Sequence, residues 1–199
     1  TKNMFSWFSL DGNFTSKVGY TTSNRFSIYS YSWSNDSAFG IKSLQFTNQK
    51  ATLYIASFNN DGIPKHGFQY NHSFTISFWC KKNLDNTKEI LFDTNTTAVA
   101  LSNFRLFYTE TNTIGFVFAG GENIYTTNTY TPNTWHHFAF TYNGENNKIQ
   151  VFGNGLLENE LVLSGNTTIG SDNNVIGGPS TKYGYAEEFY ANSLNLDGT

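Results

Sequence analysis

The chain has 199 residues, of which 18% are aromatic and 14% are charged, and its formal net charge is −3. This balance argues against a nucleic-acid partner, because phosphate binding needs a concentrated surface of Lys and Arg. No apolar run is long enough for a transmembrane helix, so we expect no membrane insertion. A chain of this size can bury roughly 70% of its unfolded surface without the help of disulfides.

The length also bears on domain organisation. A chain of 199 residues is typical of one larger β-sandwich, so we expect a single domain over residues 1–199. The chain begins at Thr1, without Met or a signal-like segment, which indicates a processed protein or a domain of a longer one. Cys80 is the only cysteine. By parity it shares a strand face with Ile76 and Phe78, which predicts a small buried side chain rather than a reactive thiol.

Short segments rich in aromatic and β-branched residues, separated by polar turns, predict strands along the whole chain. In chain order these strands are expected at 4–10, 41–46, 52–56, 68–81, 90–92, 104–108, 114–119, 123–127, 134–142, 148–152, 161–163, 167–169, 175–176 and 185–190. No segment has the periodicity of an amphipathic helix. The pattern predicts an all-β fold, an antiparallel jelly-roll sandwich of two sheets.

A long polar excursion over residues 13–38 follows the first strand, and loops of this length are usually functional or carry local structure. Within it, Tyr29, Tyr31 and Trp33 share one parity and alternate with serines. If the segment is extended, the three rings point to one side. They either cover an edge of the core or form an exposed aromatic site.

The stretch 134–157 is the most regular part of the sequence. Phe138, Phe140 and Tyr142 share one parity, and Trp135, His137, Ala139 and Thr141 share the other, which is the spacing of a strand. Asn143-Gly144 is expected to reverse the chain through positive φ angles, and Gly153-Asn154-Gly155 to reverse it again. The two strands and two turns predict a meander with one buried face.

Several short motifs resemble the laminin-G-like group of the concanavalin A-like lectin/glucanase superfamily. They are Phe8-Ser9-Leu10-Asp11-Gly12, Leu44-Gln45-Phe46, Phe74-Thr75-Ile76-Ser77-Phe78-Trp79, Trp135-x-His137, Tyr142-Asn143-Gly144 and Ile176-Gly177-Gly178. The resemblance spans nearly the whole chain and implies a jelly-roll fold. It also implies that Trp79, Trp135 and His137 occupy framework positions, where they serve packing.

The resemblance further implies one structural calcium ion. In some members of the family, a structural calcium lies where the exit of the first strand meets the last strand, whose motif is Gly-x-Ile-Asp-Glu. Here Gly184-Tyr185-Ala186-Glu187-Glu188 takes that place, with Glu187 instead of Asp. Asp11 and Asn13 would supply oxygens from the other side, as hard cations require. Solvated acids at a strand end are the alternative interpretation.

Catalysis is not expected. A glycoside hydrolase needs two carboxylates in one groove, and the only acidic residues at i, i+2 spacing, Glu158 and Glu160, fall in a polar turn region. The adjacent Glu187 and Glu188 point to opposite faces of a strand, as do His136 and His137, so neither pair can act jointly on a substrate or a metal.

Carbohydrate sites combine exposed aromatic rings with nearby amide, hydroxyl or carboxylate groups. Besides Tyr29, Tyr31 and Trp33, the candidates are Asn123, Tyr125 and Tyr130 around one excursion and Tyr183 on another. The resemblance implies a non-catalytic carbohydrate-binding or adhesion module, extracellular or on a cell or virion surface. Its partners would be a glycan or glycosylated surface, together with other domains or subunits of a larger assembly. The alternative is a structural or protein-interaction module without sugar binding, and a hydrolase or lyase is a distant third.

Overall fold

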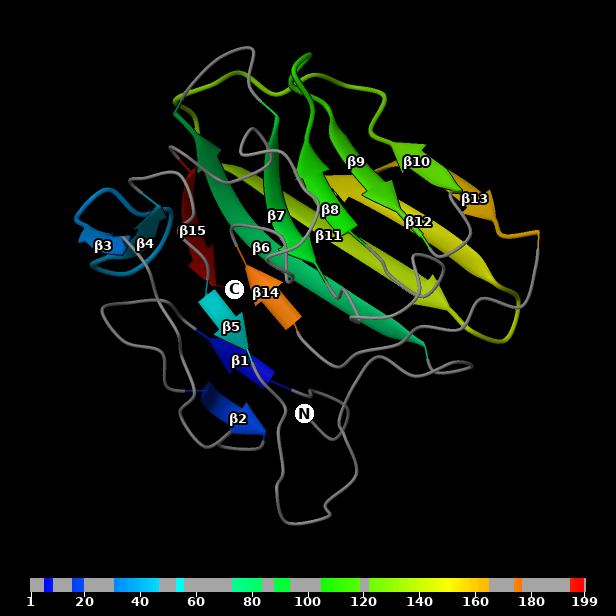
Figure 1. The fold of residues 1–199 in the computed structure, drawn as a ribbon, viewed down its shortest axis with the longest axis horizontal. Coiled ribbons are helices and arrows are strands. Elements are labelled where there is room, and N and C mark those ends of the chain that lie inside the picture. Colours follow the sequence, from blue (N-terminus) through cyan, green and yellow to red (C-terminus); the bar gives the residue numbers. More distant parts are fainter. Residues whose placement is uncertain are drawn as a thin grey trace, which may run out of the picture.

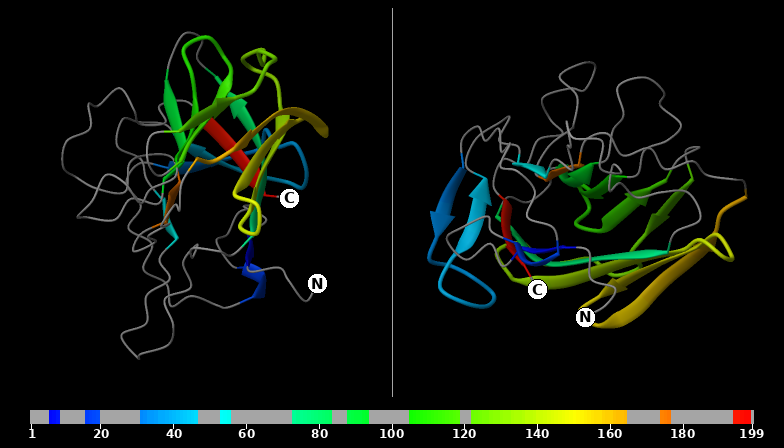
Figure 2. Two further views of the ribbon diagram at one scale, coloured as in Figure 1. Left: turned by 90° about the vertical axis from the view of Figure 1, so that its right-hand side faces the viewer. Right: turned by 90° about the horizontal axis from the view of Figure 1, so that it is seen from below.

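The computed structural model describes residues 6–8, 16–19, 31–46, 53–55, 73–83, 88–93, 105–118, 122–164, 174–176 and 194–198. Fifteen strands lie in these segments, and every pairing between them is antiparallel. Figure 1 shows their arrangement and Figure 2 shows the sheets as separate layers. The predicted all-β antiparallel sandwich of two sheets is confirmed.

The larger sheet has seven strands in the order β13-β12-β11-β6-β15-β4-β3. They are β3 (Tyr31–Ser34), β4 (Ser43–Phe46), β6 (Phe74–Lys82), β11 (His136–Asn143), β12 (Lys148–Gly153), β13 (Leu156–Val162) and β15 (Leu194–Gly198). The last strand of the chain thus lies in the middle of this sheet, between β6 and β4.

The second sheet has six strands in the order β10-β9-β8-β7-β14-β5. They are β5 (Leu53–Ile55), β7 (Glu89–Asp93), β8 (Arg105–Tyr108), β9 (Ile114–Val117), β10 (Asn123–Tyr125) and β14 (Asn174–Ile176). A separate pair joins β1 (Ser6–Phe8) to β2 (Ser16–Gly19). The described part of the chain contains no helix that is long and apolar enough to cross a membrane.

The core lies between the two sheets and is largely aromatic. Phe138, Phe140 and Tyr142 of β11 are 0%, 0% and 1% exposed, as their parity predicts. The Phe140 ring packs on Phe116 of the opposite sheet, with 5.6 Å between ring centroids. Cys80 is fully buried in the same core, as predicted, and burial raises the pKa of its thiol.

The predicted meander is confirmed, but its first turn differs from the prediction. β11 and β12 pair from Asn143 and Lys148, so the connection has four residues and ends at Asn147 with φ 51°. Asn143 and Gly144 do not have positive φ, because the longer loop needs a left-handed residue only at its end. The second turn is a two-residue turn with φ 50° at Asn154 and 83° at Gly155, which suits a tight hairpin.

Other strand boundaries also differ. β2 and β3 lie inside the predicted polar excursion, β13 begins five residues before the predicted 161–163, and β15 was not predicted. β13 is an edge strand whose outer side meets solvent. Because it contains Glu and Asn residues, it lacks the regular apolar alternation by which a strand is predicted. The predicted strands 167–169 and 185–190 lie outside the described residues.

Candidate functional site

On β6 and β11, side chains that point away from the core form the outer face of the seven-stranded sheet. The register pairs Trp79 with His137 and Ser77 with Ala139, and these residues alternate with Phe78, which packs against the core, and with the buried Phe138. The alternation follows from the period of two of a strand. Aromatic and polar groups from neighbouring strands are therefore side by side on a surface outside the core.

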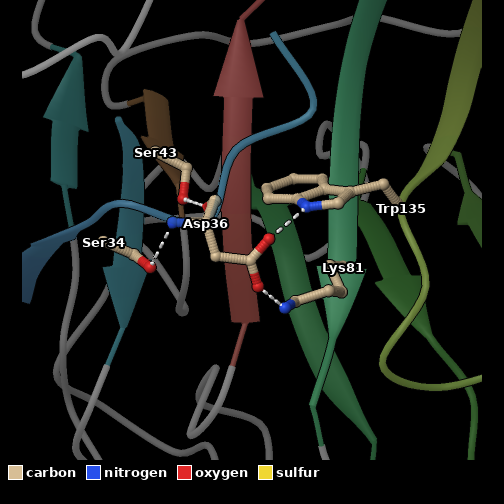
Figure 3. A network of polar contacts seen from close by, with 5 residues as sticks. All are labelled: Ser34, Asp36, Ser43, Lys81 and Trp135. Carbon is tan, nitrogen blue, oxygen red and sulfur yellow. Dashed lines mark hydrogen bonds and ion pairs between the residues drawn. The ribbon is translucent and has the colours of Figure 1, made fainter. Parts of the chain in front are cut away.

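The loop between β3 and β4 packs against this face through Asp36. The Asp36 carboxylate accepts hydrogen bonds from the Lys81 ammonium and from Nε1 of Trp135, the latter at 2.8 Å (Figure 3). Asp36 N donates to Ser34 Oγ at 3.1 Å, and Ser43 Oγ donates to the Asp36 carbonyl at 2.6 Å. The backbone of Asp36 is thus held by serines at both ends of the hairpin, while its carboxylate is held by Lys81 and Trp135.

The two members of the Lys81–Asp36 ion pair differ in exposure. The Lys81 side chain is 12% exposed, whereas the Asp36 side chain is 49% exposed. Burial lowers the pKa of Lys81, and the ammonium lies 5.9 Å from the centroid of the Trp135 ring. The pair therefore presents its carboxylate to solvent and keeps its ammonium against the sheet.

Aromatic rings extend this arrangement. The Phe39 ring contacts Trp79 edge to face, with 5.1 Å between centroids, and 59% of Phe39 is exposed. The Trp79 ring in turn lies 5.3 Å from the His137 ring. We call this set the outer-face cluster, and it consists of Asp36, Phe39, Trp79, Lys81, Trp135 and His137.

His137 is held by several hydrogen bonds. Its Nε2 lies 2.8 Å from Ser77 Oγ, and its backbone N–H donates to Asn154 Oδ1 at 3.0 Å. Burial lowers the pKa of His137 and of His136. His136 points to the other side, where its ring contacts Tyr130 at 5.0 Å, so the predicted opposite orientation of the two histidines is confirmed. Among the described residues, no three His, Cys, Asp or Glu side chains are grouped to hold a metal ion.

The first predicted aromatic set lies mostly at the core edge or outside the described residues. Trp33 is half-buried, pairs with the buried Leu44, and packs against the core. It therefore covers the edge of the core, which was one of the two alternatives. Tyr31 is described only through its backbone, which pairs with Phe46. Tyr29, Tyr183, Asp11, Asn13 and Glu187 lie outside the described residues, so those predictions stay predictions.

The second predicted set, Asn123, Tyr125 and Tyr130, contains both exposed and buried residues. Asn123 and Tyr125 of β10 are exposed, and the Tyr125 ring, 40% exposed, meets Phe107 edge to face at 6.2 Å. Tyr130, in contrast, is 4% exposed and packs on Phe138 at 4.6 Å. Its hydroxyl donates to the Glu158 carboxylate. Tyr130 thus contributes to the core, whereas Asn123 and Tyr125 remain accessible.

The i, i+2 acids on β13 make separate structural contacts. Glu158 accepts hydrogen bonds from the Tyr130 hydroxyl and, at 2.9 Å, from the backbone N–H of Asn128. Glu160 forms an ion pair of 2.6 Å with Lys148 and accepts from Gln150 at 3.1 Å. Hydrogen bonds from Lys148 and Gln150 lower the pKa of Glu160. Each of the two carboxylates is thus engaged with its own partners within the fold.

Sequence reasoning missed the outer-face cluster as a unit. The parity of the 134–142 strand places Trp135 and His137 opposite the buried Phe138, which is a signal that the rings face away from the core. Asp36 and Phe39 carry no such signal, because they lie in a loop and meet partners far away in sequence. Trp79 and Trp135 do pack, as the resemblance implies, but they pack against the loop on the outer face.

The family model of the concanavalin A-like lectin/glucanases superfamily matches residues 50–192, more than half of the chain. The predicted laminin-G-like resemblance is confirmed by this match. The β3–β4 hairpin, with Asp36 and Phe39, precedes the matched range. A search of curated protein sequences found no match.

Solved structures share the fold at low sequence identity. The carbohydrate-binding module CBM40 of the Ruminococcus gnavus IT-sialidase is similar with a TM-score of 0.52 and 18% identity, covering 65% of this chain and 76% of that one. Domains LG4-5 of the mouse laminin alpha1 chain give 0.59 and 11%, covering 76% and 40%. The binding domain of Paraclostridial Mosquitocidal Protein 1 gives 0.67 and 15%, covering 98% and 47%. At these identities the likeness establishes the fold.

Proposed function

Because the chain belongs to the concanavalin A-like lectin/glucanases superfamily, we propose that it is a non-catalytic module that recognises glycans through the outer-face cluster. The observation that carries the proposal is the Phe39 ring, which is 59% exposed beside the Trp79 ring and belongs to the same loop as the half-exposed carboxylate of Asp36. An exposed aromatic ring next to a fixed acceptor is the combination that a sugar site requires.

The physical match concerns both parts of a sugar. A pyranose presents C–H groups that pack on an aromatic ring, and hydroxyl groups that donate and accept hydrogen bonds. Phe39 and Trp79 supply the rings, and Asp36 supplies an acceptor whose direction is fixed by Lys81 and Trp135. Because these partners already hold the carboxylate, binding a ligand loses little side-chain freedom there.

Known proteins with this fold support a binding role. The Ruminococcus gnavus CBM40 has been solved bound to α2,3- and α2,6-sialyllactose, and a botulinum neurotoxin serotype D binding domain also shares the fold. A glycan or glycosylated cell surface is accordingly the proposed partner, with an extracellular, cell-surface or virion location and a place in a larger assembly. A fold hosts many functions, so the residues of the cluster carry the argument.

The experiment is glycan-array binding of the isolated chain, comparing Phe39→Ala with Tyr125→Ala. Tyr125 is the matched control, because it is an exposed aromatic residue on the other sheet, where the sequence also predicts a site. Phe39→Ala is expected to weaken binding about tenfold, the loss of one ring contact of about 1.4 kcal/mol, without lowering the melting temperature.

Other results of this experiment would relocate or remove the function. If Tyr125→Ala abolishes binding and Phe39→Ala does not, the ligand lies on the six-stranded sheet, and the outer-face cluster is structural. If the wild-type chain binds no glycan, with or without calcium, the sugar-binding proposal fails.

A protein-interaction module is the second candidate, and the edge strand β13 favours it. Leu156, Leu157 and Val162 on this strand are 69%, 50% and 62% exposed. Exposed aliphatic side chains on a sheet edge suit a protein partner better than a sugar. Absence of glycan binding would make this the leading account.

The calcium site at Asp11, Asn13 and Glu187 stays a proposal that rests on the family resemblance. If calcium binds there, it stabilises the folded state by mass action, so the melting temperature rises in calcium chloride relative to EDTA. Equal melting temperatures in the two solutions, with no heat of calcium binding, would exclude a calcium site.

A further inference from the structure

We infer that the outer-face cluster selects neutral glycans and discriminates against acidic ones, an inference that rests on the glycan-binding function proposed above. The ligand class is a neutral saccharide that donates hydroxyl hydrogen bonds to Asp36 while one face of the sugar packs on Phe39. Sialylated, uronate-containing or sulfated glycans are the disfavoured class.

The Asp36 carboxylate is available to a ligand as an acceptor. An ionised carboxylate has about four acceptor positions, and Lys81 and Trp135 occupy two of them. The side chain is 49% exposed, so the other positions are open to hydroxyl donors. Hydrogen bonds to an ionised group are roughly twice as strong as those between neutral groups, which makes this acceptor a strong determinant of ligand choice.

Both ion pairs described on the outer face expose the anion more than the cation. In the first, the Asp36 side chain is 49% exposed and that of Lys81 12%. In the second, the Glu160 side chain is 47% exposed and that of Lys148 29%. At these two pairs a ligand therefore meets the carboxylate oxygens before the ammonium groups, whereas Lys42 in the β3–β4 loop donates to the neutral amide of Asn35 at 2.9 Å.

An acidic glycan meets two penalties at this surface. Its own carboxylate or sulfate would come close to Asp36, and like charges placed together oppose binding. It would also have to take Lys81 from Asp36, which would leave Asp36 without its cation. Recognition of a carboxylate usually uses a cation that can reach it, above all the planar guanidinium of Arg. A neutral hydroxyl group meets neither penalty.

The test is an array that pairs each neutral glycan with its acidic form, for example lactose with sialyllactose and N-acetyllactosamine with its sulfated form. The wild-type chain is expected to bind the neutral member at least tenfold more tightly. This preference should decrease as salt rises from about 0.05 to 0.5 M, because screening weakens repulsion between exposed charges. Asp36→Asn should reduce the preference at least threefold, whereas Glu160→Gln, which removes the other exposed carboxylate, should change it less.

The outcomes separate this inference from the function on which it rests. Binding confined to the acidic members, or a neutral preference that neither salt nor Asp36→Asn changes, overturns the selectivity while the glycan-binding function stands. Absence of binding to both members of every pair overturns the function itself. The salt series uses the wild-type chain, so the test does not depend on the folding of a variant.

Discussion

The inner and outer faces of β6 and β11 alternate along the same backbone, yet their aromatic residues meet different neighbours. On the inner face, Phe140 is fully buried and contacts Phe78 and Phe116, at 6.2 and 5.6 Å between centroids. On the outer face, Trp79 and Trp135 are half-buried and meet the β3–β4 loop. The inner contacts join neighbouring strands and, through Phe116, the two sheets, whereas the outer contacts to the β3–β4 loop join one sheet to one loop.

This difference indicates that the stability of the fold depends mainly on the inner face, whereas recognition of a ligand depends mainly on the outer face. Full burial in a packed core gives a side chain contacts on all sides, and its removal leaves a cavity. A half-buried ring on the outer face keeps one side for solvent or ligand, and its removal opens a surface instead. Substitutions on the inner face should therefore change the free energy of unfolding, and those on the outer face should change mainly binding.

The largest expected effect comes from Phe140→Ala, which removes a ring from the inner face. Loss of a fully buried Phe costs about 3–5 kcal/mol of unfolding free energy. The matched outer-face change, Trp135→Ala, removes a half-buried ring and its hydrogen bond to Asp36, and should cost no more than about 2 kcal/mol. Urea denaturation followed by circular dichroism measures both. Equal losses in the two variants would contradict the division between the faces.

A smaller effect is expected when a methyl group is added on the inner face at Gly153. This residue pairs with Phe138, and a Cβ there would overlap the Tyr130 hydroxyl and the Glu158 carboxylate. Gly153→Ala should therefore cost about 1–3 kcal/mol, as overpacking does, and the hydrogen bond between Tyr130 and Glu158 should be displaced.

Gly155→Ala is the control for this change, because it lies two residues away in the adjoining turn. No atom lies within 4 Å of a Cβ at Gly155, so only its φ of 83° opposes the substitution. The backbone strain should cost about 1 kcal/mol, which denaturant unfolding can resolve. If Gly155→Ala costs more than Gly153→Ala, backbone strain outweighs the core contact.

The inner face could be predicted from the sequence, because its signal is local. The alternation of Phe138, Phe140 and Tyr142 specified which side of the strand is buried, and the Asn154-Gly155 pair specified the tight turn. The turn after Asn143 was predicted less well. Asn-Gly can adopt positive φ, but the pairing of the strands placed the left-handed residue at Asn147.

The candidate site could not be predicted in the same way, because its contacts join distant segments. Asp36 meets Trp135, 99 residues away, and no spacing rule relates an acid in a loop to an indole on another strand. Trp33 was ambiguous in the sequence for a different reason. Because it alternates with serines, it could have belonged to an exposed site, and only its pairing with Leu44 shows that its side chain faces the core. Strand β15 was missed because its five residues have few apolar side chains, although it pairs with β6 in the middle of the sheet.

The smallest expected effect is a pH dependence that originates at His136 and His137, which lie on opposite sides of β11. Burial lowers the pKa of His136 and His137 below the ordinary 6.5, so the unfolded chain binds more protons than the folded one just below that pH. Their contribution is therefore fully present above about pH 6.5 and is lost as the pH falls toward the folded pKa values. The lowered pKa of Glu160 affects the stability only at a lower pH, below about 4.5.

The melting temperature of the wild-type chain should thus decrease between pH 7 and 5.5, and that of a His136→Gln/His137→Gln variant should decrease less. An equal decrease in the variant would assign the dependence to other groups, and the partial burial of one histidine on each side of β11 would then have no electrostatic consequence.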